Sequence, residues 1–140
     1  NGFFFFNEDS TFSLPSEKEI ISCLSKSLVD HDLAIGCINI IFCSDAHLLE
    51  MNKEYLDHDY FTDILTFQMS QTPLSGDLFI SIDRVKDFSV QNKITFEDEL
   101  NRVMIHGILH LIGYNDKTEE EVKETSYIKG LYLCKLSVPI

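Results

Sequence analysis

The sequence predicts an α+β fold: a single small mixed β-sheet of about four strands packed by helices, one of which is central. Three observations support this prediction. Four short segments have the β-branched and aromatic composition of strands. The second half has helical periodicity bounded by capping residues. The order along the chain is strand, helix, strand, helix, two strands and then helices, which favours α+β, with α/β as the alternative.

The expected strands are the segments where β-branched and aromatic residues concentrate. They cover residues 3–6 (FFFF), 37–43 (CINIIFC), 64–67 (ILTF) and 77–82 (DLFISI). The first is apolar throughout, so we expect it to be fully buried. The last two are expected to be joined by a loop that contains Pro73 and Gly76, since these residues interrupt regular structure.

The expected helices in the first two thirds of the chain each begin at a polar capping residue. An S-x-x-E capping box at Ser16 opens the first helix, which should end near Asp30. Asp45 is the expected cap of a second helix that runs to about Tyr55. A third helix is expected over residues 83–92.

The two remaining helices lie in the C-terminal part. Thr95 is the expected N-cap of a helix over residues 96–112, and Gly113 is expected to end it. This helix is apolar on most sides, so it should be the central one. Thr118 opens a T-x-x-E capping box for a last helix that should reach about residue 133.

Length and composition indicate one domain over residues 1–140. A hydrophobic fraction of 44% in 140 residues is enough for one substantial core. No apolar run approaches the roughly 18 residues of a membrane-spanning helix, so we expect no membrane partner. The cysteines are scattered and form no C-x-x-C pair, so we expect all four to be reduced in a cytoplasmic protein: Cys23, Cys37, Cys43 and Cys134.

The charge is strongly acidic, with 23 Asp and Glu against 11 Lys and Arg and a net charge of -12. Affinity for nucleic acid comes largely from Lys and Arg neutralising phosphates. An extended, nonspecific RNA-binding surface is therefore excluded, and any role on nucleic acid must depend on a local site.

The candidate site is a metal centre at His106, His110 and Asp116. Residues four apart lie one turn above each other on a helix, so both imidazoles leave the same face and can reach one ion. Gly113 allows the chain to turn back at the helix end, which can bring Asp116 over the two histidines. Two nitrogens and one carboxylate, with one position open to water, suit a catalytic zinc site. The alternative is an incidental pair of hydrogen-bonded core histidines.

The stretch from 106 to 116, HGILHLIGYND, resembles the signature H-G-x-L-H-L-x-G-Y-D-H of the YbeY family of bacterial metal-dependent endoribonucleases. Upstream, residues 51–67 (MNKEYLDHDYFTDILTF) are similar to the family's N-x-x-Y segment followed by T-[DN]-x-L-[ST]-F. Residues 75–81 (SGDLFIS) resemble its G-D strand. The match covers about two thirds of the chain in the same order.

The resemblance implies a small α+β fold that holds one Zn²⁺ ion per chain, with other divalent metals as alternatives. It also implies cleavage of single-stranded RNA in ribosomal RNA maturation, at the 3′ end of 16S RNA, and in ribosome quality control. The partners would be ribosomal RNA or the small ribosomal subunit, together with basic ribosomal or assembly proteins that suit an acidic surface. The pattern assigns ligands but no general acid or base.

Two positions depart from the family pattern. Asp116 stands where the family usually has a third His, which lowers the positive charge at the metal. Leu56 stands where many members carry an Arg that meets substrate phosphate. Arg102, one turn before His106, is a candidate substitute for that Arg. Lys53 and Lys117 are the others.

Two other functions stay open. A ribosome-assembly factor that cleaves nothing is compatible with Leu56, Asp116 and the acidity. A metallopeptidase is disfavoured because residue 107 is Gly, whereas H-E-x-x-H peptidases take their general base from that position.

Several other polar residues have ordinary structural explanations. Thr62, Asp63, Thr66 and Asp77 could orient substrate or a ligand, but they suit strand and turn positions equally well. The remaining histidines lie in polar surroundings and are expected at the surface: His31, His47 and His58.

Overall fold

A computed structural model describes residues 2–114 and 118–124, and it has the predicted α+β architecture. The elements in chain order are β1 (Gly2–Asn7), α1 (Glu17–Asp30), β2 (Ile35–Cys43), α2 (Asp45–Leu56), β3 (Ile64–Ser70), β4 (Leu74–Ser81), α3 (Ile82–Gln91) and α4 (Phe96–Ile112). Residues 119–124 are also helical. The prediction of about four strands in one sheet is confirmed.

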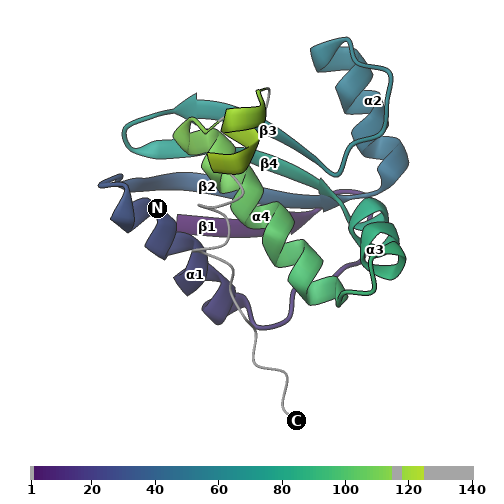
Figure 1. The fold of residues 1–140 in the computed structure, drawn as a ribbon, viewed down its shortest axis with the longest axis horizontal. Helices are drawn as coiled ribbons and strands as arrows, with labels where there is room; N and C mark the ends of the chain where they lie inside the picture. Colours follow the sequence, from purple (N-terminus) through teal and green to yellow (C-terminus); the bar gives the residue numbers. More distant parts are fainter. Residues whose placement is uncertain (1, 115–117, 125–140) are drawn as a thin grey trace.

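The sheet has the strand order β1-β2-β4-β3 and is mixed, as predicted. The pairs β1/β2 and β2/β4 are parallel, whereas β3 and β4 form an antiparallel hairpin. The parallel pairs need crossovers, and α1 supplies the first of them. The hairpin places β3 at one edge of the sheet, with β1 at the other (Figure 1). The expectation of a fully buried first strand is wrong, because Phe3 of β1 is buried whereas Phe4 and Phe6 are exposed.

The two faces of the sheet are covered unequally. On one face, alternate residues of the strands, such as Phe3, Ile40 and Leu78, are buried in the main core with α1 and α4. Figure 1 shows α4 running across the sheet with α1 beside it. On the other face, α2 covers a smaller cluster that includes Cys43 and Leu48. The main core therefore lies between the sheet and α4.

The central helix is α4, as the sequence predicts. The Thr95 side chain accepts a hydrogen bond from the Asp98 backbone N–H at 3.1 Å, which is the expected N-cap. Gly113 closes the helix with φ +125°, a backbone conformation that favours glycine. The capping box of Thr118 and Glu121 is also present, since each side chain accepts from the other residue's backbone N–H.

The predicted caps of α1 and α2 are wrong in detail. Ser16 has a left-handed backbone (φ 56°) and its side chain makes no capping hydrogen bond. Ser44, one residue before Asp45, caps α2 by accepting from the His47 N–H. Asp45 instead receives two hydrogen bonds from the Arg84 guanidinium of α3, which lower the pKa of its carboxyl group. The hydrogen bonds between Asp45 and Arg84 therefore link α2 to α3.

The predicted loop between the last two strands is shorter than expected. Gly76 lies inside β4, and Ile82, expected to end that strand, is the first residue of α3. A Cβ atom at Gly76 would lie 2.5 Å from the Phe67 carbonyl oxygen and 3.1 Å from Leu111 of α4. Glycine is therefore needed here because β3 and α4 approach the strand closely, and not because the chain turns.

The expectation of four reduced cysteines is wrong for Cys23, which is disulfide-bonded in this structure. Cys37 and Cys43 are free, and Cys43 is buried in the smaller core. Cys134 lies outside the described residues. In the described part of the chain, every helix is too short or too polar to span a bilayer.

Candidate metal centre

The face of α4 that carries the two histidines is the one accessible stripe of the helix's central portion. From Glu99 to Leu111 every residue is buried except Arg102, His106 and His110, which are half-buried. These three residues are spaced four apart, so they form one row along the helix. The row is accessible to a ligand, while the rest of this portion of α4 is packed in the core.

The two imidazoles converge as the sequence predicts. The Nε2 atoms of His106 and His110 lie 2.9 Å apart, and the ring centroids are separated by 4.5 Å. Two nitrogens bound to one tetrahedral zinc ion at 2.0–2.1 Å lie roughly 3.3 Å apart. The rings would need to open by only a few tenths of an ångström to share an ion, so the pair fits a metal.

The third predicted ligand, Asp116, lies outside the described residues, as does Lys117. Among residues 2–114 and 118–124, no group of three or more His, Cys, Asp or Glu side chains could hold a metal ion. The described part of the chain thus supplies two ligands, and a complete site needs a further residue.

The C-terminal turn of α4 is held firmly, which fixes the direction of the chain just before Asp116. The Tyr114 N–H donates to the Leu109 carbonyl at 3.0 Å, and the Gly113 N–H donates to the His110 carbonyl at 3.1 Å. This pair of bonds is a Schellman motif. The Gln68 side chain of β3 donates to the Leu111 carbonyl at 2.8 Å, so the hairpin also holds this end of the helix.

Gly107, the residue after His106, packs against the sheet. A Cβ atom there would come within 2.6 Å of Ile64 Cδ1 and 3.1 Å of Leu78 Cδ2, both in the sheet. Any side chain at 107 would therefore point into the core. A Glu at this position would have to displace the Ile64 and Leu78 side chains and lie against them, which disfavours the arrangement of an H-E-x-x-H peptidase.

Arg102, the predicted phosphate-binding candidate, lies in the row with the histidines but is bound to carboxylates. Its Nε and Nη2 atoms donate to the two carboxyl oxygens of Glu99 at 2.6 Å each, and Nη2 lies 3.9 Å from Asp63 Oδ2. The Glu99 hydrogen bonds raise the pKa of Arg102. The guanidinium also covers the Phe88 ring, 5.0 Å from its centroid. A substrate phosphate would have to meet the remaining edge, Nη1.

The other candidates for phosphate contact and orientation lie elsewhere or have structural partners. Lys53 forms an exposed ion pair with Asp59, and Leu56 is the last residue of α2. Asp77 accepts a hydrogen bond from the Asn39 side chain at 3.0 Å across two strands. The Asp77 contact agrees with the ordinary structural explanation of that residue.

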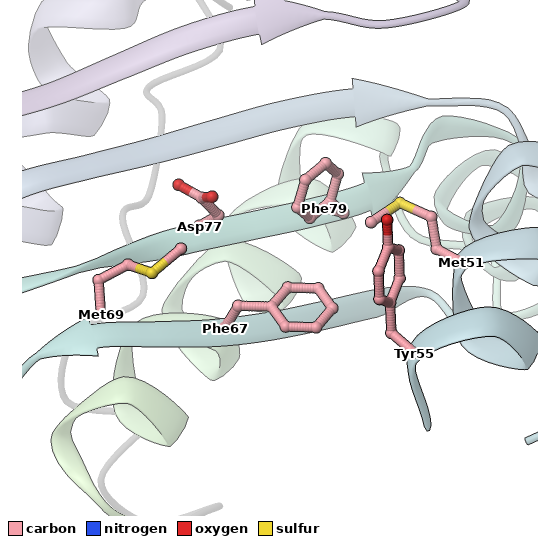
Figure 2. A pocket seen from close by; sticks show the side chains of 6 residues that line it. All are labelled: Met51, Tyr55, Phe67, Met69, Asp77 and Phe79. Atoms are coloured by element: carbon pink, nitrogen blue, oxygen red, sulfur yellow. The ribbon is translucent and has the colours of Figure 1, made fainter. Parts of the chain in front are cut away.

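A pocket lies on the face of the sheet opposite α4. It has a volume of about 300 Å³ and is lined mainly by apolar side chains of α2, β3 and β4. Figure 2 shows Phe67 and Phe79 side by side on neighbouring strands, with Tyr55 and Met51 of α2 next to them. Successive strand residues point to opposite faces, so this pocket is separated from the histidine row by the sheet itself.

Sequence reasoning missed His31, which was expected at the surface. It is half-buried at the C-terminal end of α1, and its two ring nitrogens contact the Ser27 carbonyl oxygen and the Tyr114 hydroxyl. His31 and Tyr114 are 83 residues apart in the chain. No local sequence signal could have paired them.

The family model and the relatives of known name agree on one family. The family described as "Endoribonuclease YbeY" matches residues 6–136. A protein named Endoribonuclease YbeY from Cytophaga hutchinsonii is 49% identical over 120 residues, covering 84% of each chain. Its namesake from Bacteroides fragilis is 45% identical over 122 residues, covering 85% of this chain and 88% of its own. The solution structure of TM1509 from Thermotoga maritima is similar with a TM-score of 0.62 and 26% identity, covering 94% of this chain and 86% of that one.

Proposed function

The chain belongs to the YbeY family of endoribonucleases, and from this premise we propose that it cuts single-stranded RNA at a zinc ion held by His106, His110 and Asp116. The endoribonuclease activity follows from the family. The choice of zinc, the single-strand preference and the third ligand are the new parts of the proposal.

The metal assignment rests on the distance of 2.9 Å between the Nε2 atoms of His106 and His110, which lie on the accessible row of α4. Imidazole nitrogens with one carboxylate are a donor set that zinc accepts, and they leave one position open. An ion held by these residues would lower the pKa of a water ligand and polarise a phosphoryl oxygen, which is the chemistry that hydrolysis of a phosphodiester needs.

The protein's own residues set the electrostatics around that chemistry. Asp116, in place of a neutral imidazole, adds one negative charge to the ligand set, so we expect the water to be less acidified than in a three-histidine site. Arg102 supplies the positive charge nearest along the helix row, with Nη1 as the edge that can meet a phosphate. With a net charge of -12, binding must depend on this local site.

In the cell, we place this activity in ribosomal RNA processing, at the 3′ end of 16S RNA, and in ribosome quality control. The small ribosomal subunit in the cytoplasm is then the partner. Basic ribosomal or assembly proteins suit the acidic surface of the chain and can bring the enzyme to an RNA that its charge would otherwise repel.

The direct test is cleavage of an unstructured RNA oligonucleotide and of the same sequence in a duplex. We expect cleavage of the single strand, its loss after treatment with a chelator, and its recovery on addition of Zn²⁺. Duplex cleavage at an equal rate would contradict the single-strand preference, and cleavage that survives complete metal removal would contradict the metal assignment.

A second function, that of a ribosome-assembly factor that binds without cutting, is favoured by one observation. The only Arg in the histidine row of α4 is already paired with Glu99, so substrate phosphate meets little free positive charge on that row of the described helix. In the same assay this factor would leave RNA intact with every metal tested. A metallopeptidase is disfavoured by the core-facing position of Gly107.

A further inference from the structure

Two exposed phenylalanines lie on a surface that continues from the histidine row of α4. Phe88 of α3 is 41% exposed, and the guanidinium carbon of Arg102 lies over its ring, 5.0 Å from the ring centroid. Phe61, in the segment between α2 and β3, is 51% exposed, and the guanidinium carbon of Arg84 lies 4.8 Å from its ring centroid. Each of these exposed rings is therefore paired with an arginine.

The two pairs are connected to each other and to the metal pair. Arg84 and Phe88 are four residues apart on α3, so they lie one turn apart on the same side of that helix. Arg102 is four residues before His106 in the accessible row of α4, and α3 lies beside this part of α4 (Figure 1). From the metal pair outward, the order of side chains is therefore Arg102, Phe88, Arg84 and Phe61. We call these four residues the Arg–Phe surface.

The two arginines of this surface offer little net positive charge to a phosphate. Nε and Nη2 of Arg102 donate to the Glu99 carboxylate, and the same two atoms of Arg84 donate to the Asp45 carboxylate. These carboxylates raise the pKa of the arginines, and the charge of Asp63 raises both further. Neutralisation of phosphates is the usual source of affinity for nucleic acid. The Arg–Phe surface therefore needs another group of the RNA to bind.

Unpaired bases are the groups of RNA that exposed rings can bind. Bases stack on aromatic side chains in a way that tolerates any sequence, because every base has a π-face. A guanidinium lies over one face of each phenylalanine, and a large fraction of each residue stays accessible. Because the guanidinium is itself held by a carboxylate, the ring loses little conformational freedom when a base stacks on it. Bases in a duplex already stack on each other and are not available.

We propose that Phe88 and Phe61 stack the unpaired bases of the RNA strand that reaches the histidine row, and that this contact selects single-stranded RNA. The inference rests on the proposed function, which places cleavage at that row. Phe88 contacts Arg102 and binds the base nearer the cut, whereas Phe61, beyond Arg84, binds a base further along the strand. Stacking then supplies most of the affinity of this acidic protein for RNA.

The test is the affinity of the zinc-reconstituted protein for two fluorescent strands of equal length. One is oligoadenylate, and the other is an abasic strand with the same sugar–phosphate backbone. Binding is measured by fluorescence anisotropy, and gel electrophoresis checks that the strands stay intact. Phe88→Ala and Phe61→Ala are each expected to weaken oligoadenylate binding about tenfold and to leave binding of the abasic strand unchanged. Phe88→Tyr keeps an aromatic ring and should bind oligoadenylate as the wild type does.

The matched control is Phe4→Ala. Phe4 is 43% exposed, close to the exposed fraction of Phe88, but it lies on β1, at the opposite edge of the sheet from β3. Its replacement should leave the affinity for both strands unchanged. The loss caused by Phe88→Ala should be the same at low and high salt, because stacking releases no counterions. The metal content per chain should be equal in all variants, which separates base binding from the metal site.

Each result decides between the alternatives. A Phe88→Ala protein that binds oligoadenylate as tightly as the wild type overturns the inference and leaves the proposed function standing. An equal loss of binding to the abasic strand shows that the ring supports the fold or Arg102 instead of a base, and also overturns it. Oligoadenylate binding that depends on Phe88, in a wild type that cleaves RNA with no metal, supports base stacking and removes the proposed function.

Discussion

Replacing His110 with Ala is expected to lower the rate of RNA cleavage by about a thousandfold or more. His110 Nε2 is one of the two ring nitrogens that converge on the metal position. The neighbouring residues of α4 are buried in the core, so none of their side chains can replace His110 as a ligand. A catalytic metal contributes several kcal/mol to transition-state stabilisation. A loss of about 4 kcal/mol corresponds to a factor of about a thousand. The measurement is kcat/KM on a fluorescent single-stranded RNA.

The control for this prediction is His47→Ala. His47 is a half-buried histidine of α2, which packs on the other face of the sheet from α4. Its replacement should leave cleavage within about twofold of the wild type, and both variants should have the same circular dichroism spectrum. Cleavage by folded His110→Ala at a rate near that of the wild type would contradict a metal held by this pair.

Replacing Arg102 with Ala is expected to destabilise the fold by about 3–5 kcal/mol. The Glu99 side chain is 1% exposed, and both of its carboxyl oxygens accept hydrogen bonds from Arg102. Without the guanidinium, a buried carboxylate would lose its charge partner, which is the costly way to break a buried ion pair. The measurement is the free energy of unfolding from urea denaturation.

Two further variants separate the buried pair from ordinary loss of charge. Lys53→Ala breaks the exposed ion pair with Asp59 and should cost at most about 1 kcal/mol. Glu99→Leu combined with Arg102→Met removes both charges and should recover much of the stability lost in Arg102→Ala. If Arg102→Ala unfolds at the same urea concentration as the wild type, the buried carboxylate does not depend on this partner.

The local signals in the sequence predicted the central helix well. Three predictions are confirmed: the N-cap at Thr95, the helix end at Gly113, and the capping box of Thr118 and Glu121. They could be made from the sequence because capping depends on residues a few positions apart. The same reasoning failed at Ser16, whose backbone is left-handed, and placed the cap of α2 one residue late, at Asp45. At those two helix starts more than one polar residue suits the cap, and tertiary contacts decide between them.

The arrangement of the elements was beyond local signals. The order β1-β2-β4-β3 depends on pairings between strands far apart in the chain. The role of Gly76 in close packing appeared in the sequence only as a break in the pattern. The metal pair was predictable because an i, i+4 spacing on a helix fixes the geometry of both side chains. The His31 contact with Tyr114 was not, since it joins two helices through their C-terminal ends.

The central claim is that this chain holds one metal ion between His106, His110 and Asp116. It is tested most directly by the metal content per chain of untagged protein, for the wild type beside His106→Ala and Asp116→Ala. We expect one zinc ion per wild-type chain and its loss from both variants, because binding needs all the ligands of the site. A wild type that holds no metal after reconstitution with zinc, nickel or manganese, or a His106→Ala variant that keeps its metal, would contradict the claim.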